Sequence, residues 1–432
     1  MNRRQTALLL LLLSLLMINN VCAQDSEPTR QQRKEQRRHE REERRRIRRE
    51  ERAGIHTPKE EAIKPASTQG ITYPSTELKQ RYRIDVFVQL YLDELVKTGS
   101  AAYKEHMPDK ARAGMAFYQG VNMAADSLKK MGVKADVYVH DITTAGETTA
   151  EQIMAGRLNN SDLMIGAVGS KDATALAAYA AERHINFVSA MHVEDDGTKS
   201  NPYLTMLVPT AAAYCSKMVA EVNNHYGGQR VLLLYRKSNI ADSAAWQAVM
   251  NNEATQRLAM KKLNCRNIPT RAKLEAIVDS GKTNIVMVPV AERGYADSLV
   301  RALASWFPGT HFEVYGIAQM STAQKNKKAL PNADIHQYAP FVYDSTAALV
   351  KSITYSYKKE HYSKPPELVY RGYETMFWYA NLLKAYGTIF NEHYADISRA
   401  PLTPFTIKPA RNAAGELNYY NNVQLYALPV AH

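Results

Sequence analysis

Two serines, a lysine and a histidine carry the groups in this chain that could do chemistry. Ser189 and His192 lie three residues apart, directly after an apolar β-rich segment, and they could form a nucleophile and its base. The sequence offers no third group that would orient the base, so a hydrolase ranks last among the functions that we consider. Ser170 and Lys171 follow another apolar segment, in the run Gly166-Ala-Val-Gly-Ser-Lys-Asp172. We interpret these side chains as hydrogen-bonding groups that line loops, in a protein that is not an enzyme.

The signatures of common catalytic and cofactor sites are missing from the sequence. Gly281-Lys282-Thr283 matches only the end of a phosphate-binding loop, and a helical pattern precedes it where a strand is needed. No Gly-x-Gly-x-x-Gly turn, Gly-x-Ser-x-Gly elbow or His-Glu-x-x-His helix occurs. The 12 histidines are scattered singly, without a second ligand nearby at metal-binding spacing. We therefore expect no cofactor and no dedicated metal site.

The elements that must position Ser170 and Ser189 follow a regular rhythm. After Arg83, β-rich runs alternate with helical patterns every ~25 residues, which predicts an α/β fold with doubly wound parallel sheets. The expected strands are 84–92, 136–142, 163–168, 185–190 and 203–208 in a first series, and 230–236, 260–265, 284–290, 311–317 and 335–341 in a second. The expected helices are 109–131, 149–158, 171–183, 211–226, 241–258, 270–280, 295–307, 345–362 and 366–386. Two lobes fit this series better than one very wide sheet.

In doubly wound sheets, ligands bind beyond the carboxyl ends of the strands, where loops and helix N-termini converge. This rule selects Ser170, Lys171, Ser189, Ala190 and His192 from the first lobe, and Tyr235, Arg293 and Asp344 from the second. Ser170 would be the N-cap of a helix whose free N–H groups suit a carboxylate, although an ordinary helix cap fits it equally well. We predict that the two rims close on a small polar or anionic molecule.

The chain begins with the features of a secretory signal peptide. A basic start precedes an apolar run of 12 residues from Ala7 to Ile18 and the small-residue cleavage signal Val21-Cys-Ala23. We therefore expect residues 1–23 to be removed and the mature protein to lie in the periplasm or cell envelope. The apolar run is shorter than the ~20 residues that span a bilayer, and no later segment qualifies. A lipoprotein anchored at Cys22 is the alternative, but Asn19-Asn-Val21 lacks the lipobox pattern.

Residues 24–80 are rich in Arg, Glu, Gln, Pro, Ser and Thr, so we place them outside the folded domain as a disordered or helical spacer. Half of the formal net charge of +12 lies in Arg30 to Arg52, which holds 12 Lys and Arg against 6 acidic residues. This tract could contact anionic lipid or an anionic envelope polymer, or it could be a solvated spacer. The rest of the chain is only mildly basic, which argues against nucleic-acid binding.

Cys215 and Cys265 are the cysteines that would remain after removal of the signal peptide. An oxidising compartment would allow them to form a disulfide. Two buried free thiols are the alternative.

Several segments resemble the type 1 periplasmic-binding-protein superfamily. They are Phe117 to Val121, Asp126 to Gly132, Val137 to Asp141, Asp162 to Gly166, Ile185 to Ser189 and Asn201 to Tyr203. Gly372-Tyr-Glu-Thr375 and Asn418 to Tyr426 resemble the C-terminal helix and closing strand of that superfamily, and the likeness covers about residues 83–428. The superfamily includes the Leu/Ile/Val-binding proteins of ABC importers. The likeness is strongest to bacterial envelope members, which often carry a peptidoglycan-binding LysM module, and it implies two lobes joined by a hinge.

The resemblance also implies roles for single residues. Ser170 and the backbone at Ala190 match positions that bind the carboxylate of an amino-acid ligand, and Ser189 and His192 would flank that subsite. Where the amino-acid binders show Gly-Pro-x-Ser-Ser, this chain has Gly166-Ala-Val-Gly-Ser-Lys171, so a lysine replaces the second hydroxyl. The loop from Tyr91 onward is long and charged instead of short and small, and no LysM-like module is visible.

These observations predict a non-enzymatic, extracytoplasmic solute-binding protein that holds an amino-acid-like ligand between two lobes, with the membrane subunits of an ABC importer as partners. We expect lobe 1 at residues 81–210, lobe 2 at 211–344, and a return to lobe 1 with a C-terminal tail at 345–432. The alternative is an envelope scaffold or regulator of cell-wall synthesis that uses the fold to contact protein or peptidoglycan. The replaced hydroxyl and the long first loop suit this alternative.

Overall fold

The computed structural model describes residues 73–97, 108–191, 200–318, 320, 330–394, 402–412 and 414–430. The predicted signal peptide, the tract from Arg30 to Arg52 and His192 lie outside these ranges. All described residues belong to the second of the two units into which the chain divides, Ala66–His432. Within the described ranges, none of the helices combines the length and apolar character that a membrane crossing requires.

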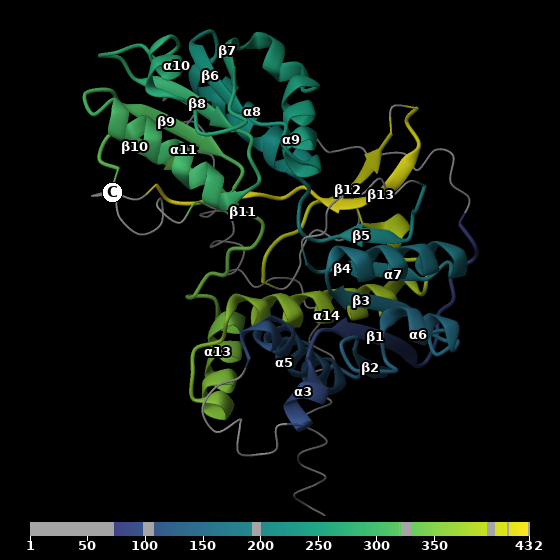
Figure 1. The fold of residues 1–432 in the computed structure, drawn as a ribbon. Coiled ribbons are helices and arrows are strands. Elements are labelled where there is room, and N and C mark those ends of the chain that lie inside the picture. The colour runs from purple at the N-terminus through teal and green to yellow at the C-terminus, as the bar shows by residue number, and fades with distance from the viewer. Residues whose placement is uncertain are drawn as a thin grey trace, which may run out of the picture. The chain divides into compact units, whose positions relative to one another are not determined.

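Strands and helices alternate along the chain as predicted (Figure 1). The strands are β1 (Tyr82–Val88), β2 (Ala135–Asp141), β3 (Leu163–Ala167), β4 (Asn186–Ser189), β5 (Leu204–Met206), β6 (Arg230–Tyr235), β7 (Ala259–Asn264), β8 (Asn284–Val288), β9 (Phe312–Gly316), β10 (Ala333–His336), β11 (Tyr338–Ala339), β12 (Ile407–Arg411), β13 (Leu417–Asn422) and β14 (Tyr426–Ala427). The helices are α3 (Leu92–Lys97), α5 (Asp109–Lys130), α6 (Thr149–Met154), α7 (Ser170–Arg183), α8 (Ala211–Tyr226), α9 (Ile240–Met250), α10 (Arg271–Glu275), α11 (Arg293–Trp306), α13 (Ala348–His361) and α14 (Glu367–Tyr386), with short 3-10 helices at Glu253–Arg257 and Asn391–His393.

The strands form two main sheets that share one winding order. The seven-stranded sheet runs β2-β1-β3-β4-β5-β13-β12, and all its neighbours are parallel except β13 and β12. The five-stranded sheet runs β7-β6-β8-β9-β10 and is parallel throughout. The winding direction reverses between β1 and β3 in one sheet and between β6 and β8 in the other. The predicted doubly wound α/β class is therefore confirmed, and each sheet has a topological switch point.

The central strands of the seven-stranded sheet, such as β3 and β4, are buried on both faces, which explains why they are largely apolar runs. Val86 and Val88 of β1 pack with α5 and α14, whereas Phe87 between them packs with α7 on the other face. In Figure 1, α5 and α14 lie together beside this sheet. Successive residues of a strand point to opposite faces, so one apolar run serves two cores.

Gly120 of α5 and Gly372 of α14 let these two helices touch backbone to backbone. A Cβ atom on Gly120 would collide with the carbonyl oxygen of Val369, and one on Gly372 would collide with that of Phe117. Only glycine leaves room for so close an approach. The helix pair that supports the seven-stranded sheet therefore depends on two residues without side chains.

The five-stranded sheet is built in the same way, and its two faces separate the cysteines. Leu232 and Leu234 of β6 pack with α10 and α11 in the cluster that contains Cys265. Val231 and Leu233 pack with α8 and α9 in the cluster that contains Cys215. The two thiols are free and buried on opposite faces of the sheet, so the disulfide considered from the sequence does not form. Burial raises the pKa of each thiol to about 12.

The chain passes between the two sheets after β5, after β11 and again after β13. The last passage is fixed by β14, which pairs antiparallel with β11 through Tyr338 and Ala427. The tail had little helical pattern, and it forms β12, β13 and β14. Three helices end at least four residues earlier than predicted: the one expected at 149–158 ends at Met154, the one expected at 241–258 ends at Met250, and the one expected at 270–280 ends at Glu275.

The N-terminal boundary of the fold lies earlier than the predicted spacer end at residue 80. Tyr73 forms a hydroxyl–hydroxyl hydrogen bond with Tyr420 of β13, 3.0 Å long. Thr76 donates its hydroxyl to the carbonyl oxygen of Tyr386, and the N–H of Thr388 donates to the carbonyl oxygen of Glu77. Residues 73–79 are therefore bound to the folded core.

Candidate functional site

The switch points collect several of the residues that the sequence singled out. Strands β1 and β3 are neighbours, so the loop that begins at Tyr91 and the start of α7, with Ser170 and Lys171, follow adjacent strand ends. Between β6 and β8, Tyr235 ends one strand and Arg293 begins the helix after the other. The carboxyl ends of these strands are where doubly wound proteins bind ligands. Ser170 and Lys171 thus lie after a strand at the switch point of the first sheet, and Tyr235 and Arg293 lie after strands at that of the second.

Ser170 was predicted to be the N-cap, but it is the first residue of α7. The helix therefore begins one residue earlier than predicted. The N-cap is Gly169, whose backbone is extended and whose position has no side-chain cap. Ser170 is half-buried and Lys171 is exposed. The first N–H groups of a helix have no acceptor within the helix, and its dipole places partial positive charge there. With the Lys171 ammonium beside it, this helix start suits an anion.

Ser189 and Ala190 end the neighbouring strand, but their polar atoms are engaged within the protein. Ser189 is fully buried, and its hydroxyl donates to the carbonyl oxygen of Met191 over 3.5 Å. The N–H of Ala190 donates to the carbonyl oxygen of Gly166 at 2.8 Å. The carboxylate-binding role that the resemblance implied for the Ala190 backbone would need this donor to be free. His192, the remaining predicted residue of this group, lies outside the described residues.

Arg371 of α14 is a charged residue in this region that the sequence reasoning missed. Its Nη1 donates to the carbonyl oxygen of Ala190 at 3.3 Å, and its guanidinium lies 4.3 Å above the ring of Phe341. Glu367, one helical turn earlier, accepts from Nε and Nη2. Burial raises the pKa of Tyr214 in α8 to about 12, and the Arg371 charge opposes that rise. Arg371 therefore interacts with residues from three places: Ala190 after β4, Phe341 after β11 and Tyr214 at the start of α8.

Asp141 at the end of β2 binds the N–H groups that follow β1. Its carboxylate accepts from the N–H groups of Leu90 and Leu92, each at 2.8 Å, and from the hydroxyl of Thr143 at 2.6 Å. Burial opposes ionisation, but these hydrogen bonds outweigh it and hold the pKa of Asp141 below its usual range. Tyr91, between the two N–H donors, has a left-handed φ of 56°. The N–H groups of Leu90 and Leu92 after β1 are thus already bonded to an anion, which is the protein's own Asp141 carboxylate.

A buried ion pair joins the loops at the switch point of the five-stranded sheet. Arg236, directly after β6, donates from Nε to Asp242 of α9 and from Nη2 to Glu292 at 2.7 Å. Asp242 also accepts from the N–H of Ala291, which follows β8, at 3.0 Å. The Arg236 guanidinium lies 4.1 Å above the ring of Tyr295. The sequence reasoning missed Arg236 and Asp242, whose only signal is a charged pair six residues apart at a strand end.

The predicted residues of the second group have mixed surroundings. Tyr235 stacks on Trp246 of α9 with 3.7 Å between ring centroids, and Arg293 is exposed at the start of α11. Asp344 is exposed and follows β11, away from the switch point between β6 and β8. Hydrogen bonds from the hydroxyl and N–H of Thr346 lower the pKa of Asp344, so its local role is to form the turn before α13.

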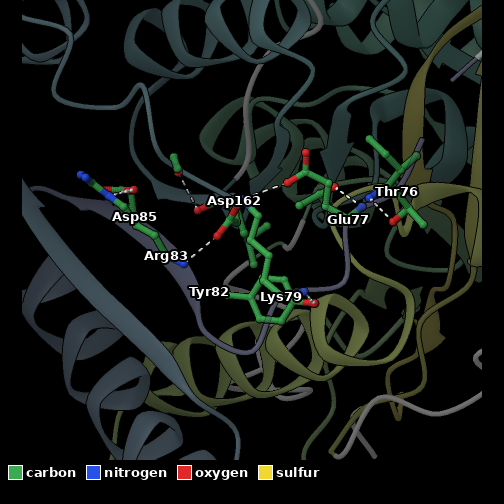
Figure 2. Close-up of polar contacts among 11 residues, drawn as sticks. Thr76, Glu77, Lys79, Tyr82, Arg83, Asp85 and Asp162 are labelled. Atoms are coloured by element: carbon green, nitrogen blue, oxygen red, sulfur yellow. Dashed lines mark hydrogen bonds and ion pairs between the residues drawn. The ribbon is translucent and has the colours of Figure 1, made fainter. Parts of the chain in front are cut away.

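The opposite, amino-terminal edge of the seven-stranded sheet carries a separate polar cluster (Figure 2). Asp162 accepts from the Lys79 ammonium at 2.7 Å and from the N–H of Arg83 at 2.8 Å. The Arg83 guanidinium forms two hydrogen bonds of 2.9 Å with the buried Asp85, which is also bonded to His140 at 2.7 Å. Lys79, Arg83 and Asp162 lie at the amino-terminal ends of β1 and β3, and the groups of this cluster satisfy one another, so we assign them to stability.

Comparisons with known proteins agree with this topology. Residues 109–256 match a family model described as periplasmic binding protein. A chain from Rhodospirillum rubrum, assigned to a branched-chain amino acid ABC transporter, shares the fold with a TM-score of 0.59 and 12% identity over 81% of this chain and 97% of its own. An ABC transporter substrate-binding protein from Desulfitobacterium hafniense, solved in complex with Leu, has a TM-score of 0.51 and 10% identity over 80% and 96% of the two chains. An ABC-type branched-chain amino acid transporter chain from Rhodopseudomonas palustris has a TM-score of 0.51 and 15% identity over 80% and 96%. No curated protein matches the sequence.

Two parallel sheets of the same winding order, together with these matches, define a periplasmic-binding-protein-like α/β protein. The chain has the type 1 periplasmic binding protein fold, and the resemblance that its sequence carries to that superfamily is confirmed.

Proposed function

We propose that this protein is a non-enzymatic, extracytoplasmic solute-binding protein that holds a small anionic, amino-acid-like ligand at the carboxyl ends of its two sheets. The arrangement that carries the proposal is the pair of switch points, with the start of α7 at one and the loops after β6 and β8 at the other. Solved proteins of the same fold include an ABC transporter substrate-binding protein in complex with Leu. By analogy, the partners would be the membrane subunits of an importer, and the site of action would be the periplasm or cell envelope.

The charges on the first sheet favour a ligand with a carboxylate. The N–H groups at the start of α7 would bind one carboxylate oxygen, with the Ser170 hydroxyl and Lys171 ammonium beside them. Arg371 adds a second positive group at the end of β4, next to Ala190. Lys171 stands where the amino-acid binders have a second hydroxyl, and its positive charge would make the site prefer negatively charged ligands more strongly than a hydroxyl would. We therefore expect acidic amino acids or other small dicarboxylates among the best ligands.

A thermal-shift screen of the full chain against amino acids and small organic acids tests this proposal. We expect at least one compound to raise the melting temperature, because binding to the folded state alone stabilises it. The double variant Ser170→Ala, Lys171→Ala should lose the shift. Its matched control is Ser216→Ala, Lys217→Ala, which removes the same two side chains from the second turn of α8 and should keep the shift. No shift with any compound would count against solute capture.

An envelope scaffold that contacts protein or peptidoglycan is the second candidate. Asp141 and Asp242 favour the scaffold. Their carboxylates accept hydrogen bonds from backbone N–H groups after β1 and β8, so these N–H groups are not available to a solute. A pull-down with peptidoglycan and with anionic lipid vesicles should compare the full chain with a form that begins at Ala66, where the second unit starts. Retention that disappears with the tract from Arg30 to Arg52, in a protein without a ligand-induced shift, would favour the scaffold.

A further inference from the structure

Two histidines and two carboxylates meet on one face of the five-stranded sheet, at its β10 edge. His311 directly precedes β9 and Glu313 lies within it, while Asp334 and His336 lie in β10. Glu313 is the register partner of Asp334 in the parallel pairing of the two strands. Residues two apart on a strand share a face, so all four side chains emerge on the same side. Phe312, between His311 and Glu313, points to the opposite face and is fully buried there.

The spacing of three of these side chains matches a metal ion's ligands. The Nε2 atom of His311 lies 3.5 Å from a carboxylate oxygen of Glu313 and 3.3 Å from one of Asp334. One ligand atom from each of the three residues lies within 4.8 Å of the others. Zinc bonds of about 2.0–2.2 Å in tetrahedral geometry place neighbouring ligand atoms roughly 3.3–3.5 Å apart. The two distances from His311 are thus those that an ion between the ligands would impose, and the Glu313 and Asp334 oxygens lie within 4.8 Å of each other.

The fourth residue holds one of these ligands in place. His336 Nε2 lies 2.7 Å from the second carboxylate oxygen of Glu313, so the glutamate bridges the two histidines. The His336 ring stacks on Tyr315 of β9 with 4.2 Å between centroids and 5° between planes. Metal-binding carboxylates are commonly fixed by such outer hydrogen bonds. Glu313 therefore has a determined orientation before any ion binds.

The surroundings allow an ion to enter and to be held. The side chains of His311, Glu313 and Asp334 are 38%, 20% and 23% exposed, so they are partly shielded but reachable from solvent. The two carboxylates supply negative charge that a divalent cation would neutralise, and the ion would bind the imidazole in its neutral form. Nitrogen and oxygen ligands together suit zinc and the neighbouring transition metals better than calcium or magnesium, which prefer oxygen alone. The paired strands form a rigid base for the site.

We propose that His311, Glu313 and Asp334 bind one divalent transition-metal ion, zinc in the first instance, with His336 as the residue that positions Glu313. The remaining coordination position would be open to water or to an outside ligand. The site lies at the amino-terminal half of β9 and at β10, away from the loops after β6 and β8, so it is independent of the proposed solute site. No short sequence motif announces it, because the ligands come from two strands separated by 16 residues.

Titration of the metal-free full chain with Zn²⁺, in competition with a chromophoric indicator, tests the proposal. We expect one tight equivalent of zinc and a higher melting temperature when zinc is added. His311→Ala and Asp334→Asn should each lose that equivalent, and the asparagine variant keeps the size of the side chain in case the alanine variant folds poorly. Co²⁺ in place of Zn²⁺ should give visible absorption bands that both variants lack.

Two further variants separate a metal site from a simple ion-pair cluster. His336→Phe keeps a ring on Tyr315 but removes the hydrogen bond to Glu313, and it should weaken zinc binding about 10–100-fold at unchanged stoichiometry. The matched control is His361→Ala in α13, which removes a histidine that faces one glutamate, Glu360, at 4.0 Å. This control should bind zinc as the wild type does. Absence of the tight equivalent, or its survival in both His311→Ala and Asp334→Asn, would overturn the proposal.

Discussion

Arg371 of α14 donates a hydrogen bond from Nη1 to the carbonyl oxygen of Ala190, 3.3 Å away. These residues are 181 positions apart in the sequence, and the contact puts a guanidinium at the carboxyl end of β4. The Arg371 side chain is only 14% exposed, and Glu367 offsets its charge on one side. The proposed solute site therefore has a cation from the C-terminal part of the chain as well as Lys171 after β3.

Arg371→Met should weaken binding of an anionic ligand by about tenfold or more, because a hydrogen bond to a charged group contributes about 1.5–3 kcal/mol. Arg271→Met is the matched control, because Arg271 forms a similar pair with Glu275 one turn away in α10. Competition binding with the best compound of the thermal-shift screen measures both. Equal affinities of the two variants would remove Arg371 from the site.

Gly120→Ala and Gly372→Ala should each lower the free energy of unfolding by about 1–3 kcal/mol, because the added methyl group meets the backbone of the partner helix. Gly294→Ala in the first turn of α11 is the control, since a Cβ there meets nothing within 4 Å. It should be neutral or stabilising by up to about 1 kcal/mol. Urea denaturation followed by circular dichroism gives all three values, and a destabilised Gly294→Ala with an unaffected Gly120→Ala would contradict the helix contact.

Asp242→Ala should cost about 3–5 kcal/mol of stability, because it leaves the buried Arg236 guanidinium without its main partner. The surface pair of Arg230 and Asp279 provides a comparison, with side chains 31% and 45% exposed. Asp279→Ala should cost no more than about 1 kcal/mol. If chemical denaturation gave the two variants equal losses, the switch point after β6 would not depend on the buried pair.

The buried Glu374 of α14 should make the free energy of unfolding fall as the pH rises. Its carboxylate accepts from the N–H groups of Leu402 and Thr403, but burial dominates and raises its pKa from 4.5 to about 8. Between these pH values the folded state keeps a proton that the unfolded state has released. The free energy of unfolding should therefore fall from pH 4.5 to about 8, by at most about 1.4 kcal/mol per pH unit from this group, and then level off.

Glu374→Gln should remove this contribution, whereas Glu360→Gln at an exposed position of α13 should retain it. Denaturation midpoints measured from pH 5 to 9 on the two variants and the wild type test the effect. A Glu374→Gln profile as steep as that of the wild type would mean that another group titrates.

The parallel sheets were predictable because burial on both faces demands long apolar runs, such as Leu163 to Ala167 and Asn284 to Val288. The start of α7 at Ser170 was predictable to within one residue from the Gly-rich turn after β3. β12 was not predicted, because Ile407–Arg411 contains a proline and pairs antiparallel at the sheet edge, where little apolar pattern is required.

The groups around the candidate sites were harder to predict, because they are defined by contacts across the chain. Arg371 has one distinguishing signal, a cation in the interior of α14 far from the Lys384 of its last turn, and nothing in the sequence links it to Ala190. Asp141 was predicted only as part of the strand 136–142, although its hydrogen bonds organise the loop after β1. His311 and Asp334 are ordinary polar residues until the β9–β10 register brings them together.

Isothermal titration of the full chain with the compound that gives the largest thermal shift tests solute binding most directly. We predict one-to-one binding that the Ser170→Ala, Lys171→Ala variant loses and that the Ser216→Ala, Lys217→Ala variant retains. Heats indistinguishable from dilution for every compound, or equal affinities of the two double variants, would contradict it.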